Sequence, residues 1–71
     1  MKNKNGQAHI RDFGDGRTIV VYTEDDGLRN QLERLDGCQL VVPYQFGSRT
    51  VGADLYFPKE ARREIRTLLG A

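Results

Sequence analysis

Residues 38–57 have the sequence CQLVVPYQFGSRTVGADLYF. From 40 to 46 every even-numbered residue is apolar, and from 51 to 57 every odd-numbered residue is apolar. This alternation predicts two strands, over 38–46 and 49–57, each with one face toward a core. Gly47 and Ser48 suit the two-residue turn of an antiparallel hairpin. Because Pro43 cannot donate a backbone hydrogen bond, we place its strand at a sheet edge or at a bulge.

A second hairpin is predicted upstream of this one. Residues 17–23 are β-branched and aromatic, which is typical of a strand, and residues 13–16 contain two glycines, which is typical of a turn. Residues 7–13 form the expected partner strand, although Ile10 and Ala8 are its only aliphatic residues. The chain therefore contains two candidate hairpins, each followed by a helical pattern.

The first helical pattern follows residue 23. Leu28, Leu32 and Leu35 recur at i, i+4 and i+7, which places them on one face of a helix. Thr23 is the expected N-cap, since its hydroxyl can accept from the backbone of the first turn, and acids follow it directly. Gly37 is the expected left-handed stop.

The second helical pattern repeats this arrangement. Ala61, Ile65 and Leu68 have the same spacing. Pro58 suits the first position of a helix because its missing N–H would have no partner there, and Gly70 is the expected stop.

Together these elements predict an α+β fold of ββαββα order, a small two-layer sandwich whose antiparallel sheet has both helices on one face. We expect a single domain over residues 7–71, after a disordered N-terminal tail at residues 1–6. The sheet residues expected to meet the helices are Ile19, Val21, Leu40, Val42, Tyr44, Val51, Ala53, Leu55 and Phe57, with Phe13 and Phe46 at the turns.

Composition excludes several classes of protein. The 71 residues carry a net charge of +1, with one cysteine and one histidine, Cys38 and His9. An intramolecular disulfide is therefore excluded, and the reducing cytoplasm is the expected location, since small secreted domains usually need such bonds. No apolar run approaches the ~20 residues of a membrane span, and no leader pattern is visible. We find no zinc-ligand set and no nucleophile–base pair, so we expect no metal, no cofactor, no membrane contact and no enzymatic activity.

One resemblance involves residues 20–25, VVYTED, and residues 51–59, VGADLYFPK. These segments resemble short proteins found in bacteria and their phages. Those proteins have no assigned activity, so the resemblance implies nothing about function.

The second helix has a basic side. Lys59, Arg62, Arg63 and Arg66 lie opposite its apolar arc at 100° per residue. Lys59–Arg63 and Arg62–Arg66 are like-charge pairs at i,i+4, which disfavour an isolated helix. Two interpretations stay open: a solvated face, or an anion-binding face for a phosphate backbone or an acidic partner.

The sheet face turned away from the helices is the other candidate surface. Alternation places Val20, Tyr22, Val41 and Tyr56 on it, together with Pro43. It is either simply solvated or covered by a protein partner or a second copy of the chain. Our leading hypothesis is a non-enzymatic binding or regulatory module that acts through protein–protein interaction, in a homodimer or with another protein. The alternative is an accessory protein that binds nucleic acid weakly through the basic side of the second helix.

Overall fold

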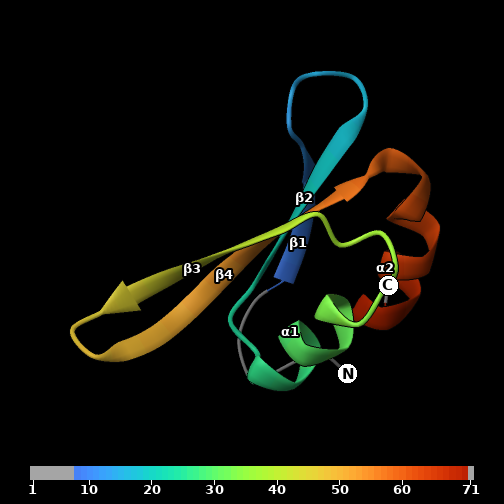
Figure 1. Ribbon diagram of the computed structural model, residues 1–71. Helices are drawn as coiled ribbons and strands as arrows, with labels where there is room; N and C mark the ends of the chain where they lie inside the picture. The colour runs from blue at the N-terminus through green and yellow to red at the C-terminus, as the bar shows by residue number, and fades with distance from the viewer. Residues whose placement is uncertain (1–7, 71) are drawn as a thin grey trace.

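The computed structural model describes residues 8–70 and has the predicted order of elements (Figure 1). All strand pairs are antiparallel, and the sheet order is β1-β2-β4-β3. The α+β architecture is confirmed, whereas the proposed tail at residues 1–6 lies outside the described residues. None of the described helices has the length and apolar character needed to cross a membrane. The elements are β1 (Ala8–Asp12), β2 (Thr18–Thr23), α1 (Asp26–Glu33), β3 (Leu40–Phe46), β4 (Arg49–Pro58), the 3₁₀ turn η1 (Lys59–Ala61) and α2 (Arg62–Leu69).

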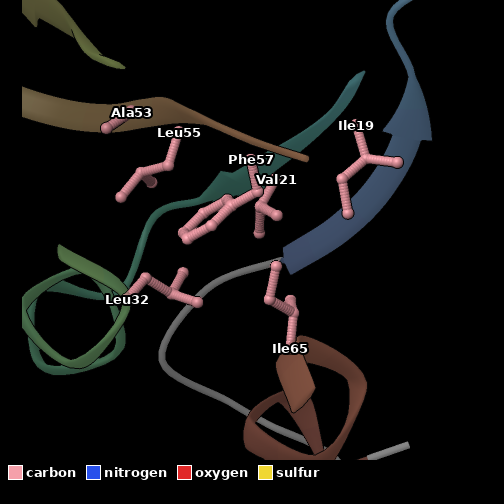
Figure 2. Packing of buried hydrophobic residues seen from close by; sticks show 7 residues of the cluster. All are labelled: Ile19, Val21, Leu32, Ala53, Leu55, Phe57 and Ile65. Carbon is pink, nitrogen blue, oxygen red and sulfur yellow. The ribbon is translucent and has the colours of Figure 1, made fainter. Parts of the chain in front are cut away.

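The core lies between the sheet and the two helices. Figure 2 shows Leu32 of α1 and Ile65 of α2 directed toward side chains of the two central strands. All seven residues of this cluster are fully buried, which confirms the helical stripes and the predicted alternation of β2 and β4. The cluster consists of Ile19, Val21, Leu32, Ala53, Leu55, Phe57 and Ile65.

The distal part of the β3–β4 hairpin extends away from both helices (Figure 1). Phe46 at its tip is 78% exposed and Val51 is 43% exposed, because no helix covers this part of the sheet. Phe13, at the other hairpin, is also exposed. The expectation that these three residues join the core is therefore wrong. The edge position predicted for Pro43 is confirmed, since β3 is one of the two edge strands.

A one-residue bulge interrupts the pairing of β3 with β4. Near the turn Gln45 pairs with Thr50, but the next pair is Tyr44 with Gly52. Val51 is therefore an extra residue on β4. Side chains along a strand alternate between the two faces of the sheet. One extra residue on β4 therefore shifts the pairing by one, so that each β3 residue beyond the bulge lies on the face opposite to the predicted one.

The bulge overturns our assignment of β3. Val41 lies opposite the buried Leu55 and packs against the core, so it does not belong to the outward face on which we placed it. The even-numbered residues of β3 instead pair with even-numbered residues of β4 and lie on the outward face. These pairs are Leu40 with Tyr56, Val42 with Asp54 and Tyr44 with Gly52.

The start of α1 differs from the prediction by two residues. Asp25 is the N-cap, and its carboxylate accepts hydrogen bonds from the N–H groups of Gly27 and Leu28. Thr23 acts one step earlier, since its hydroxyl accepts from the N–H of Asp25. Because Thr23 still belongs to β2, the helix begins only after this local turn.

Two glycines were expected to end the helices, and a proline was expected to begin the second one. Gly70 ends α2 with φ 80°, as predicted. Gly37 does not have positive φ, so it is not the left-handed stop that we expected; a Cβ there would make a tight contact, 3.2 Å from Cδ of Pro58. Pro58 ends β4 and precedes η1, so α2 itself begins at Arg62.

We expect two phenylalanine substitutions, one in the core and one at the exposed hairpin tip, to have different effects on the free energy of unfolding. Phe57→Ala should lower the free energy of unfolding by about 3–5 kcal/mol, because it leaves a cavity under both helices. Phe46→Ala should change it by less than about 0.5 kcal/mol, since the ring is exposed. Urea denaturation followed by circular dichroism measures both changes. A loss of stability in Phe46→Ala as large as that in Phe57→Ala would place the tip in the core.

Candidate binding face

The sheet face turned away from the helices, here called the outer face, is the first candidate site. Val20, Tyr22 and Tyr56 lie on it as predicted, because Val20 pairs with Tyr56 and Tyr22 pairs with Asp54. Val20 is only 1% exposed, so it lies beneath other side chains and offers no contact surface. Its cross-strand neighbour on this face is Arg11.

The centre of the outer face is a buried carboxylate. Asp54 is 3% exposed although no helix covers this side of the sheet. Its Oδ2 accepts hydrogen bonds from Nη2 of Arg11, at 3.2 Å, and from the hydroxyl of Tyr44. These donors come from the two edge strands, β1 and β3, so one carboxylate on β4 links both edges of the sheet. A buried charge is tolerated where it is paired in this way.

One oxygen of this carboxylate has no partner. Oδ1 of Asp54 is buried and accepts no hydrogen bond from the described residues. The side chain of Arg11 is 49% exposed, and that of Asp54 is 4% exposed. The pair therefore combines a buried acceptor with a guanidinium that remains accessible from outside.

Aromatic rings cross the outer face beside the carboxylate. His9 stacks on Tyr22 with ring centroids 5.3 Å apart, and Tyr22 lies 6.1 Å from Tyr44. Gly52 makes this row sterically feasible, because a Cβ there would lie 2.7 Å from the hydroxyl oxygen of Tyr22. His9, which we expected only to be a strand or tail residue, thus joins an aromatic row that spans the sheet.

A second aromatic contact lies nearer the β1–β2 turn. The rings of Phe13 and Tyr56 meet edge to face at 5.5 Å. Next to Tyr56, Leu40 on the edge strand is 54% exposed, and Tyr44 is 43% exposed. The outer face is thus a mainly apolar and aromatic surface that contains one ion pair.

The electrostatics of this face keep two tyrosine hydroxyls protonated. The hydrogen bond to Asp54 raises the pKa of the Tyr44 hydroxyl, and a hydrogen bond to Glu24 at 2.8 Å raises the pKa of Tyr22. Both phenols are therefore held in their neutral form. The same carboxylate raises the pKa of Arg11 and keeps its charge in place.

The predicted anion-binding residues lie in the other layer of the fold. Lys59, Arg62, Arg63 and Arg66 line one shallow depression along η1 and α2. Arg62 is partly neutralised, because its Nη2 lies 2.7 Å from Oδ1 of Asp12. The structure brings these four residues together, as predicted.

Our sequence analysis did not identify Arg11, Gly52 or Asp54 as site residues. The sequence shows Asp54 as an acid between apolar residues of a predicted strand, and aspartate is depleted in strands. Its partners could not be found in the same way, since they lie 43 and 10 positions away along the chain.

Comparison with protein-family models, curated proteins and solved structures gave no match to this chain. The site is therefore interpreted from its own geometry.

We expect the two raised tyrosine pKa values to depend on different carboxylates. Asp54→Asn should bring the pKa of Tyr44 down toward ~10 and leave that of Tyr22 raised, whereas Glu24→Gln should do the reverse. In the folded protein the neutral phenol is favoured, so each hydrogen bond stabilises the fold below pH ~10, and the contribution is lost as pH rises through the raised pKa. NMR titration of the ring Cζ carbons measures each residue separately. If Asp54→Asn leaves the pKa of Tyr44 unchanged, the hydrogen bond is absent in solution.

Proposed function

We propose that the protein is a small non-enzymatic binding module that acts through protein–protein interaction, with a second copy of the chain as the occupant of its outer face. The observation that supports this most directly is the half-exposed apolar surface around Leu40 and Tyr44, on a sheet layer that no described element covers. Surfaces of this composition, with aromatic residues and an arginine, are typical of protein interfaces.

Self-association is favoured by the polar groups on this face. In a two-fold dimer, residue i contacts residue j and residue j contacts residue i, so one surface must supply both donors and acceptors. Arg11 supplies accessible donors, and the exposed carboxylate of Glu24, beside Tyr22, supplies an acceptor. Two copies could therefore satisfy each other through the same pair of residues.

The size of the face sets the strength of such a dimer. Four strands about 4.8 Å apart, with about five residues each at roughly 3.4 Å, cover on the order of 250–300 Å² per copy. Stable interfaces usually bury about 800 Å² per partner. We therefore assign the dimer to the weak, transient class.

The cellular compartment that we propose rests on the number of cysteines in the chain. Cys38 is the only cysteine of the chain, and it packs against the core, where burial raises the pKa of its thiol. A domain of this size without disulfides suits the reducing cytoplasm, which is the compartment we propose.

We expect a monomer–dimer equilibrium with a Kd on the order of 10⁻⁴ M. Leu40→Lys should weaken it at least about tenfold, because it places a charge in the apolar surface of the outer face. Gln31→Lys adds the same charge on the exposed side of α1 and should leave the equilibrium unchanged. Sedimentation equilibrium over a concentration series measures the three constants.

Two results would contradict this proposal. One is a strictly monomeric protein at concentrations on the order of 1 mM, well above the expected Kd. The other is an equal effect of Leu40→Lys and Gln31→Lys, which would place the interface elsewhere.

A further inference from the structure

A second surface, in the helical layer, is formed by basic residues from three elements. Lys59, Arg62, Arg63 and Arg66 line one depression, and Lys59 and Arg62 also line a neighbouring one. The neighbouring depression adds Arg17 from the β1–β2 turn, beside Gly14 and Gly16. We call this continuous surface the basic groove and define it by Arg17, Lys59, Arg62, Arg63 and Arg66.

Most of these charges are not neutralised within the protein. Over residues 8–70 the only ion pair in the groove joins Arg62 to Asp12, so Arg17, Lys59, Arg63 and Arg66 have none. Glu60 is the other acid that lines the groove. Five cations and two acids leave a local excess of positive charge that the net charge of +1 for the whole chain conceals.

Only one of these arginines suits the helix: Arg66 lies in the last turn of α2, where the helix dipole favours a cation. Arg62 and Arg63 occupy the first turn of α2, where the helix dipole disfavours cations, and Arg62 and Arg66 are a like-charge pair at i,i+4. Both helices have an acid in the first turn, Asp26 in α1 and Glu64 in α2, but in α1 Arg29 also pairs with both Asp26 and Glu33. Arg62 and Arg63 therefore lie where cations disfavour α2, which is expected of a binding site rather than of a structural face.

We propose that the basic groove binds the phosphate backbone of nucleic acid, without base preference. Arginine forks match phosphate oxygens in bidentate geometry, and four of the five cations are arginines. A shallow, open groove without a specific pocket suits an extended polyanion. A membrane surface is disfavoured because none of the large exposed apolar residues lies on η1 or α2.

This inference does not depend on the proposed dimer. The groove belongs to the helical layer and the outer face to the opposite side of the sheet, so both surfaces can be occupied at once. A variant that weakens the dimer, Leu40→Lys, should retain nucleic-acid binding, which keeps the two proposals separable.

The first test is salt dependence with a duplex and a single-stranded oligonucleotide. Four unpaired cations predict a log–log slope of affinity against salt of about −3.6 for duplex and about −2.8 for single strands. The doubly substituted Arg63→Gln/Arg66→Gln should flatten the duplex slope by about 1.8. Its charge-matched control, Arg34→Gln/Arg49→Gln, changes exposed arginines at the C-cap of α1 and at the hairpin tip and should leave the slope unchanged.

The second test is a gain of affinity. Asp12→Asn frees Arg62 and removes an acid from the groove, so it should tighten binding and steepen the duplex slope by about 0.9. Asp26→Asn removes the same charge from an exposed ion pair on α1, where Arg29 keeps Glu33 as a partner, and should have no effect.

The results that would overturn the proposal are specific. At low salt, an absence of shifts in the NMR signals of α2 on addition of either oligonucleotide would exclude the site. Equal slopes for Arg63→Gln/Arg66→Gln and its control would place the contact elsewhere. Tighter binding of polyglutamate than of the oligonucleotides would assign the groove to an acidic protein instead.

Discussion

A single extra residue in one hairpin determines what the outer face of this protein contains. Gly47 has φ 66° and Ser48 has no positive φ, so the turn has the type II′ signs, and the residues beside it pair as the sequence alternation predicts. Val51 then adds one residue to β4, and every pair farther from the turn is shifted by one. Without that shift, Leu40, Val42 and Tyr44 would lie on the face of the sheet that the helices occupy.

The position of Asp54 shows why this shift matters. Along β4, Asp54 and Tyr56 lie on the same face of the sheet, whereas Leu55 lies on the other face. After the bulge, Tyr44 lies on the same face and donates a hydrogen bond to it from β3, while Arg11 reaches it from β1. The buried carboxylate is thus paired on a sheet side that lacks a helical cover, and the aromatic residues that shield it form the candidate interface.

The two layers of the fold present surfaces of opposite character. The outer face is aromatic and locally neutral, since Arg11 and Asp54 pair with each other. The helical layer separates charge along the chain: α1 neutralises its own arginine, whereas α2 and η1 concentrate cations with only Arg62 paired among the described residues. A net charge near zero therefore does not describe the local electrostatics, which only the arrangement of the helices reveals.

Local physics made several features predictable from the sequence alone. The i, i+4, i+7 stripes place Leu32 and Ile65 in the core, the alternation of β4 buries Ala53, Leu55 and Phe57, and Gly70 ends α2 with positive φ. The grouping of the four basic residues of η1 and α2 was equally accessible, because helical spacing brings them together. Each of these features depends on residues within a few positions of one another.

The tertiary structure decided the rest, for a physical reason. A bulge costs little free energy locally. Either face of β3 can meet the core, because Val41 and Leu40 are both apolar and lie on opposite faces. The side of β3 that met the helices was therefore chosen by packing: Val41 reaches the core, whereas the hairpin tip with Phe46 extends past it. The pairing of Asp54 with Arg11, 43 positions away, likewise depends on the strand order, which short-range patterns do not contain.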